Sequence, residues 1–238
     1  MPVPSQCFNI VRGRVMRVTY LDECGEIPLI GDPPPSCEVV VSDGLISVAM
    51  TAEIEAGETI RDRNWAGALC TTDRTPDEFL YWNVEITFCQ VDPALISLLT
   101  GAPMELDGTD AVGFRTREGS EDTHVAIEMW TGTTPVVCAP GEDPTLGYTL
   151  LPHVMGGRVG DLTIENGRAD FVVGGAYTKS GQGWGVGPYD VIGDPAGPLD
   201  VAIAEGEHHL LRTTTVAAPS ADCDCLSLEG AGGTRPTS

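Results

Sequence analysis

The stretch 81-YWNVEITFCQVDPALISLLTG-101 constrains the fold most, because it joins a regular strand directly to a very short helix. Residues 81–88 alternate between apolar and polar side chains, which is typical of a strand with one buried face. Asp92 then stands where an N-cap accepts from free helix amides, and Pro93 suits the first helical position because it has no N–H to leave unpaired. Gly101 is placed to end the helix.

The predicted helix, residues 94–99, is apolar around most of its circumference. Its large apolar residues are Leu95, Ile96, Leu98 and Leu99. They cover too wide an arc for a helix on a free surface. We therefore expect the helix to be buried against the sheet or a neighbouring subunit, where it closes an open end of the core.

Further segments have the composition of strands and make the chain predominantly β. The expected strands and hairpins lie at 8–20, 38–55 with a break at 42–44, 81–88, 122–130, 161–173 and 201–215 with a turn at 205–207. The hairpin at 161–173 is the clearest, because Asn166-Gly167 supplies the two positive-φ positions of a type I′ turn. Connections rich in glycine, proline or polar residues are expected at 21–38, 57–77 and 174–198.

Side-chain directions follow from the alternation in two of these strands. In the strand at 8–20, three arginines are expected to face outward: Arg12, Arg14 and Arg17. In the strand at 122–130, one face is expected to be apolar and is made by Val125, Ile127 and Met129. The opposite face is expected to be polar and to end at an aromatic ring; it holds His124, Ala126, Glu128 and Trp130.

A count of about eight to ten strands with one short helix favours an all-β fold. We expect an antiparallel β-sandwich or barrel with one short flanking α-helix and long loops or arms. A chain of 238 residues is long enough to bury a core of its own. We therefore expect a single domain over residues 1–218, followed by a C-terminal arm over 219–238.

The net charge limits the kinds of partner. The chain carries 35 acidic and 13 basic residues, a formal charge of −22. Because basic side chains are what bind phosphate, most of this surface repels DNA. The start MPVPSQCFNI is not a basic and apolar leader, and no run reaches the ~18 apolar residues of a membrane span. We expect a soluble protein made in the cytosol, with no membrane partner.

Eight cysteines are spread along the chain, and only 222-DCDC-225 has a tight spacing. They are Cys7, Cys24, Cys37, Cys70, Cys89, Cys138, Cys223 and Cys225. Without a secretory leader, the expected state is reduced thiols that pack as small apolar residues; disulfides formed later, outside a cell, are the alternative. A single C-x-C lacks the paired spacing of a zinc ribbon, and His208 and His209 would add ligands only by a coincidence of the fold. No metal and no cofactor are expected.

The sequence holds no recognisable catalytic constellation. Its four histidines stand in no nucleophile or metalloprotease signature, and 35 carboxylates are too many for one pair to stand out. The acidic loop residues are interpreted as solvated rather than calcium-binding; they are Asp22, Glu23, Asp107 and Asp110. The tryptophans are assigned to the core or an interface rather than to a sugar-binding platform; they are Trp65, Trp82, Trp130 and Trp184. We expect no catalytic residue and no enzyme.

Four segments taken together resemble a known family: 24-CG-25, 43-DGLISV-48, 64-NWAGALC-70 and, above all, 84-VEITFCQVDPALISLLTG-101. In this order they resemble the major tail, or tail tube, proteins of long-tailed bacteriophages, particularly those that infect actinobacteria. The resemblance covers roughly residues 8–101 and is thinner beyond them. It rests on structural residues, so it transfers no catalytic position.

The resemblance implies a β-sandwich with a flanking helix that forms hexameric rings, which stack into the hollow tube of a phage tail. Connections 21–38 and 57–77 would then reach neighbouring subunits. The implied partners are other copies of the chain and further tail proteins: the tape measure, the tail terminator and the distal tail protein. DNA would pass through the lumen without specific binding.

The implied location is the virion, after assembly in the host cytoplasm. Two other classes of protein stay open. One is a monomeric β-sandwich that binds a ligand or decorates a capsid, and the other is a hydrolase on a jelly-roll scaffold. Solution mass separates the first from a tail tube, and a pocket where His, Asp and Glu converge would mark the second.

Overall fold

The computed structural model describes residues 9–28, 37–119, 122–134, 145–165, 168–181, 191–192 and 197–228. Within these residues the chain forms fourteen strands and one α-helix, so the all-β fold class expected from the sequence is confirmed. The strands are β1 (Asn9–Leu21), β2 (Val39–Ser42), β3 (Leu45–Glu55), β4 (Thr59–Arg63), β5 (Leu69–Arg74), β6 (Glu78–Phe88), β7 (Met104–Asp107), β8 (Asp110–Phe114), β9 (His124–Thr134), β10 (Leu146–Met155), β11 (Arg158–Glu165), β12 (Arg168–Thr178), β13 (Leu210–Thr214) and β14 (Asp222–Leu226).

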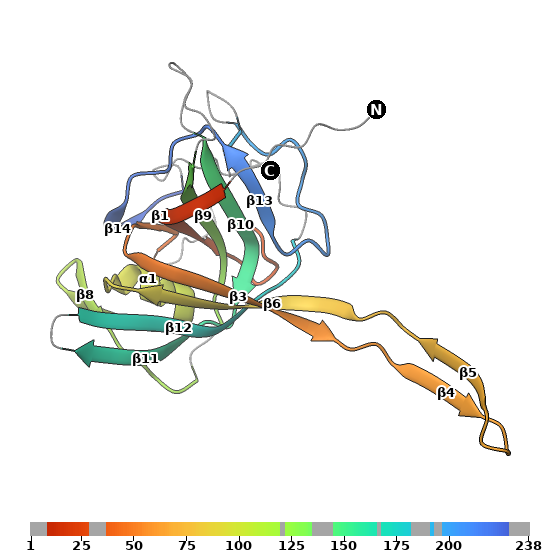
Figure 1. Ribbon diagram of the computed structural model, residues 1–238. Helices are drawn as coiled ribbons and strands as arrows, with labels where there is room; N and C mark the ends of the chain where they lie inside the picture. The colour runs from red at the N-terminus through yellow and green to blue at the C-terminus, as the bar shows by residue number, and fades with distance from the viewer. Residues whose placement is uncertain are drawn as a thin grey trace.

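Ten of the described strands form one antiparallel sheet with the order β14-β2-β1-β9-β10-β12-β6-β3. Two more strands attach to this path, β11 to β12 and β13 to β10. The sheet turns at β10, which pairs with β12 only at Val154↔Thr178 and Met155↔Tyr177 (Figure 1). The remaining strands form two small hairpins, β4–β5 and β7–β8.

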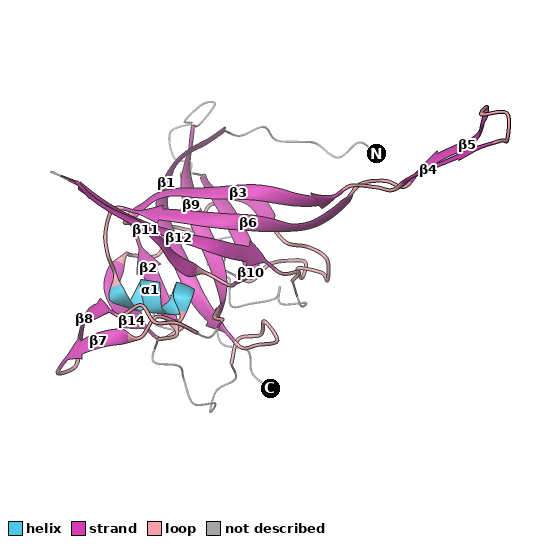
Figure 2. Cartoon of the chain, turned by 90° about the horizontal axis from the view of Figure 1, so that it is seen from below, coloured by secondary structure: helices cyan, strands magenta, loops and turns pink. Residues whose placement is uncertain are grey.

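The main core lies between the two halves of this turned sheet. Its side chains come from β1, β2, β9 and β10 on one side, from β6 and β12 on the other, and from the helix α1 (Pro93–Thr100). Helix α1 packs against β1, β11, β12 and the hairpin of β7 and β8, and Figure 2 shows it on the side of β12 that faces away from β3. Because both halves cover one cluster of buried side chains, the arrangement is sandwich-like.

Helix α1 begins and ends where the sequence predicts. The carboxylate of Asp92 accepts from the amides of Ala94 and Leu95 at 2.9 and 3.2 Å, and Pro93 occupies the first turn. Gly101 adopts φ 67° and donates its N–H to the carbonyl of Ser97 at 2.8 Å, a left-handed C-cap. The four large apolar residues of the helix are no more than 5% exposed, so the predicted burial is confirmed.

A second core covers the opposite face of β2, β1, β9 and β10. It contains Trp130 and Tyr148, whose rings lie 5.2 Å apart, and apolar residues from the segments at 191–192, 199–203 and 226–228. The prediction that Arg17 faces outward is therefore wrong, because this second layer buries it. The predicted polar face of the strand at 122–130 is likewise covered, with Glu128 0% exposed.

Several segments expected to be connections are paired strands. Residues 57–77 contain β4 and β5, and residues 174–178 continue β12. The hairpin at 161–173 is confirmed by the pairing of Glu165 with Arg168, while its turn residues lie outside the described part of the chain. The hairpin expected at 201–215 was wrong: the described chain has a turn at Gly206 but only the second strand, β13, which pairs with β10.

The C-terminal segment joins the sheet rather than forming a free tail over its whole length. β14 pairs with β2, and Leu228 behind it is 1% exposed. Cys225 of β14 forms a disulfide with Cys37, and the two Cα atoms are 5.3 Å apart. The expectation of reduced thiols is corrected for this pair, while Cys24, Cys70 and Cys89 are free. Cys7, Cys138 and residues 229–238 lie outside the described residues.

Candidate assembly interface

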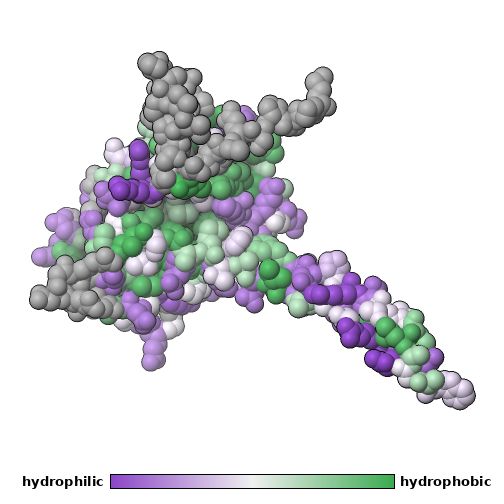
Figure 3. Space-filling view, viewed as in Figure 1, coloured by the Kyte–Doolittle hydropathy of each residue, from purple (hydrophilic) through white to green (hydrophobic). Residues whose placement is uncertain are grey.

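A hairpin projects from the body of the molecule between the end of β3 and the beginning of β6. It consists of β4 and β5, residues 59–74, and we call it the arm (Figures 1 and 2). Every residue from 58 to 80 is exposed, so the arm buries no core of its own within the chain. Figure 3 shows both hydrophobic and hydrophilic residues on the surface of the arm. The exposed side chains of the arm are therefore available for contact with another molecule.

The root of the arm is a narrow crossing of two backbone segments. The amide of Gly57 donates to the Asp77 carboxylate, and the amide of Glu58 donates to the Thr75 hydroxyl, both at 2.8 Å. A Cβ at Gly57 would lie 1.8 Å from the carbonyl oxygen of Thr75. Only glycine therefore fits this position, and the hydrogen bonds around it fix the direction in which the arm leaves the body.

The tip of the arm is an ordered turn that presents a tryptophan. The side-chain oxygen of Asn64 accepts from the amides of Ala66 and Ala68 at 3.1 and 2.9 Å. Gly67 adopts φ 80°, and its carbonyl accepts from the guanidinium of Arg63 at 2.8 Å. Trp65 lies between these residues and is fully exposed. A fully exposed tryptophan on an organised turn has the properties of an interface anchor.

The charge of the arm differs from that of the rest of the chain. Residues 59–74 hold three arginines and two aspartates, a net charge of +1, in a chain of −22. The arginines are Arg61, Arg63 and Arg74, and the aspartates are Asp62 and Asp73. The arm is therefore the part of the chain whose charge would not oppose contact with another acidic surface.

The sheet has an uncovered polar face on β6 and β3. Val84, Ile86 and Phe88 of β6 point into the main core, so Asn83, Glu85 and Thr87 point outward. Their partners on β3 are Thr51, Ala49 and Ser47, all exposed. Glu53 lies on the same face and accepts from the side-chain amide of Asn83 at 3.3 Å. Two neighbouring strands thus present a flat surface of small, polar and acidic side chains.

β3 also forms the end of the described sheet path. A strand in this position presents backbone N–H and C=O groups that another strand can pair with. The start of β3 lies close to β1, since a Cβ at Gly13 would be 3.8 Å from Cδ2 of Leu45. The sheet therefore nearly closes on itself at one end, while the rest of β3 runs out toward the arm.

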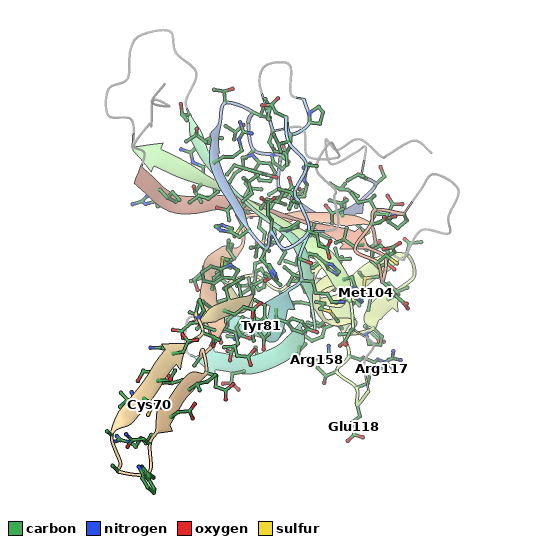
Figure 4. All side chains as sticks on the ribbon, turned by 90° about the vertical axis from the view of Figure 1, so that its right-hand side faces the viewer. Cys70, Tyr81, Met104, Arg117, Glu118 and Arg158 are labelled. Atoms are coloured by element: carbon green, nitrogen blue, oxygen red, sulfur yellow. A yellow bond between two sulfur atoms is a disulfide. The ribbon has the colours of Figure 1, made fainter. Side chains whose placement is uncertain are left out.

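A pocket of about 520 Å³ opens beside the root of the arm. Its lining includes Leu80 and Tyr81 of β6, Tyr177 and Thr178 of β12, Glu23, Cys24, His153, Lys179, Ser180 and His208. Figure 4 labels Tyr81 near the root of the arm and Cys70 on the arm itself. The rings of Tyr81 and Tyr177 lie 5.5 Å apart. The pocket thus combines two tyrosine rings and a leucine with several polar and charged groups.

Histidines line and support this pocket. Nδ1 of His124 and Nε2 of His153 are 2.8 Å apart. Nδ1 of His153 is buried without a hydrogen-bond partner, so we assign the ring proton to Nε2, from which it is donated to His124. Burial lowers the pKa of His153 to about 4, and the charges of His124 and Lys179 act in the same direction. Gly25 packs against this ring, where a Cβ would be 2.5 Å from Nδ1.

The other hydrogen bonds of the histidines are structural. The hydroxyl of Thr178 lies 2.9 Å from Nδ1 of His208 and accepts from the amide of Trp82 at 3.0 Å. Thr178 is 1% exposed, so this hydroxyl is not accessible as a nucleophile. Burial also lowers the pKa of His208, and it lowers the pKa of His209 in the same way.

The acidic loop residues singled out in the sequence lie in turns. Asp22 accepts from the amides of Cys24 and Glu26 at 2.9 and 2.8 Å, which orders the turn beside the pocket. Asp107 and Asp110 are exposed at the turn between β7 and β8. Among the described residues no group of three or more His, Cys, Asp and Glu is placed to hold a metal ion. No helix among them is long and apolar enough to cross a membrane.

The tryptophans divide between core and surface. Trp130 is buried in the second core, and Trp82 packs at the edge of the main core. Trp65 is exposed on the arm, and Trp184 lies outside the described residues. The polar composition of 57–77 is typical of a connection. The one signal for an ordered turn that displays an aromatic ring is the sequence Asn-Trp-Ala-Gly at 64–67.

Comparison of the chain with models of known protein families gives no match, and comparison with curated protein sequences gives none either.

Proposed function

We propose that the chain is a structural subunit of the tail tube of a long-tailed bacteriophage. In this role it forms hexameric rings that stack into a tube, through which DNA passes during genome delivery. The observation that carries the proposal is the arm: an ordered hairpin of which every residue is exposed, attached to a sandwich-like body. Such a hairpin is stabilised when it bridges to another subunit, as the connection 57–77 does in the proposed assembly.

The sheet path supports ring formation. A subunit that uses one surface to contact a different surface of the next copy forms a ring when the rotation closes. β3 at the end of the described path offers such a surface, and pairing or covering it within a ring would prevent uncontrolled association. Stacking of such rings along their common axis, through a second contact, then produces a tube.

The polar face of β6 and β3 is assigned to the lumen. It carries Glu53 and Glu85 among small polar side chains. A duct for DNA should not retain its cargo, and carboxylates repel phosphate where basic residues would bind it in a salt-dependent manner. The chain's charge of −22 fits the same requirement.

The proposed partners are other copies of the chain and the proteins that meet the tube at its ends and inside it: tail terminator, distal tail protein and tape measure. Segment 21–38 and the C-terminal segment are further candidates for contacts between subunits. The proposed role is structural, without catalysis or a cofactor, and its place is the virion after assembly in the host cytoplasm.

Electron microscopy of the purified protein, together with its solution mass over a range of concentrations, tests the proposal. The expected result is sixfold rings and stacked filaments, with β6 and β3 forming a negatively charged inner wall. An assembly without rotational symmetry, or a lumen lined mainly by arginine, would contradict it. A protein that stays monomeric at every concentration would instead support a binding or decoration module.

A further inference from the structure

We propose that Trp65 at the tip of the arm inserts into the pocket beside the arm root of a second copy of the chain. This inference rests on the proposed function, because it names the contact by which neighbouring subunits of the tube are joined. The pocket is the one of about 520 Å³ lined by Leu80, Tyr81, Tyr177 and their neighbours.

The tip of the arm is already ordered before it binds. Full exposure of an indole is unfavourable in water, and an interface is where exposed tryptophans contribute most. The turn holds Trp65 with hydrogen bonds from two amides to Asn64 and from Arg63 to Gly67, so little ordering remains to be done on binding. A pre-ordered anchor loses less entropy when it docks.

The pocket offers contacts that suit an indole ring. The rings of Tyr81 and Tyr177, with the side chain of Leu80, offer apolar and aromatic contact to an indole. Glu23 in the lining can accept the indole N–H, and the ammonium of Lys179 can lie over the ring face. An aromatic guest with one N–H donor therefore fits the groups present.

The charge of the arm and that of the turn beside the pocket are opposite. Arg63 lies two residues from Trp65 on an arm with a net charge of +1. The turn beside the pocket, residues 22–26, carries the carboxylates of Asp22, Glu23 and Glu26 and no basic residue. Docking the tip at this turn brings the arginine to an acidic surface, which identifies the acidic body of another copy as a complementary partner.

The Trp65 that enters the pocket must belong to another molecule, because the arm points away from the pocket of its own chain. Leu80 and Tyr81 follow directly after the arm, at its root, and the arm extends away from the body in both views (Figures 1 and 2). The tip therefore cannot reach the pocket of its own chain. Repeated tip-to-pocket docking joins copies in one direction, which is the heterologous contact that a tube needs.

Substitution of Trp65 is the first test. Trp65→Ala should leave rings intact but weaken their association into tubes by roughly tenfold or more, as expected for a hot-spot residue. Trp65→Phe should restore part of the association, and Thr72→Ala, an exposed change on the same arm, should assemble like the wild type. Sedimentation and electron microscopy report the fraction in tubes. Unchanged assembly of Trp65→Ala overturns the proposal.

Crosslinking is the second test, and it uses the natural thiol in the pocket. In a background of Cys70→Ser and Cys89→Ser that keeps Trp65, a short bis-maleimide should join an Ala66→Cys variant to Cys24 of another copy. Peptide mass spectrometry identifies the joined residues, and Cys24→Ser should abolish the product. A link from position 66 to a different residue, or no link between copies, overturns the pocket assignment.

The two tests separate this inference from the proposed function. If sixfold rings stack equally well with and without Trp65, the proposed tube function stands and the proposed docking of Trp65 is wrong. If copies associate through Trp65 close to Cys24 but without sixfold symmetry, the docking contact stands and the proposed tube function is wrong. Absence of any association between copies of the wild-type protein would remove both.

Discussion

The guanidinium of Arg17 and the carboxylate of Glu128 form a buried, two-pronged ion pair across β1 and β9. The contacts are 2.5 Å from Nε and 2.8 Å from Nη2, and both side chains are almost completely excluded from solvent. The Tyr148 hydroxyl donates to the same carboxylate at 2.7 Å, and the guanidinium lies 5.3 Å from the centre of the Trp130 ring. The pair therefore ties strands of the sheet together inside the second core.

Glu128→Gln should destabilise the fold strongly. The amide keeps the shape of the side chain but leaves the Arg17 cation buried without its counter-charge, which costs about 3–5 kcal/mol in the free energy of unfolding. Urea unfolding followed by circular dichroism measures the change. The matched variant Glu85→Gln removes a carboxylate from an exposed position and should change stability by less than about 0.5 kcal/mol. Equal stability of the two variants would contradict the structural role.

Helix α1 provides a second prediction. Leu98→Asp places a carboxylate in the main core, where Leu98 is 5% exposed, and should prevent soluble folding or assembly. Leu98→Ala should fold with a loss of about 2–5 kcal/mol from the cavity that remains. Ser97→Ala on the half-buried side of the helix is the control and should be close to wild type. Solubility and thermal unfolding give the answer, and a well-folded Leu98→Asp variant would show that the helix does not need this packing.

The histidines predict a loss of stability in mild acid. The folded pKa of His153 is lowered to about 4 from an unfolded value near 6.5, so the unfolded chain binds more protons between these values. Stability from this group is complete above pH 6.5 and is lost as the pH falls toward 4, by up to about 3 kcal/mol. The lowered pKa values of His124, His208 and His209 act in the same direction.

Measurement of the free energy of unfolding from pH 7.5 to 4 tests this behaviour. His153→Gln removes the titrating ring and should flatten the curve, even if the variant is less stable at pH 7.5. A curve that is flat for the wild type, or identical in slope for the variant, would show that His153 does not resist protonation in the fold.

The disulfide between Cys37 and Cys225 should contribute about 2–5 kcal/mol, because it closes a loop of 188 residues in the unfolded chain. Cys225→Ser, or reduction of the wild type, should lower the unfolding midpoint and increase hydrogen exchange in β14. Cys24→Ser changes a free thiol and serves as the control. If mass spectrometry finds Cys37 fully reduced in the native protein, this stabilisation is absent.

The elements that the sequence predicts best are those determined by residues close together in the chain. The helix was predicted from Asp92, Pro93 and Gly101, because caps depend on residues a few positions apart. The hairpin of β11 and β12 was predicted from a two-residue turn for the same reason. The burial of residues in α1 also followed from their number and spacing alone.

Features that depend on distant pairing were missed. Arg17 and Glu128 meet because β1 pairs with β9, and a strand with both faces covered has no polar side for the alternation to reveal. Cys37 and Cys225 are 188 residues apart, so spacing gave no sign of their bond. The arm was read as a connection because a hairpin with both faces exposed shows no apolar period.

Gly57→Ala should separate folding of the body from function of the arm. The methyl group would overlap the Thr75 carbonyl, so the root must open and its hydrogen bonds to Asp77 and Thr75 are lost. Because this region contributes no buried side chains to the core, the thermal midpoint of the body should change little, while tube formation should fall sharply. Gly174→Ala is the matched control, since a Cβ there meets nothing within 4 Å. Electron microscopy and sedimentation compare the two, and a Gly57→Ala protein that forms tubes as readily as Gly174→Ala would show that the direction of the arm does not matter for assembly.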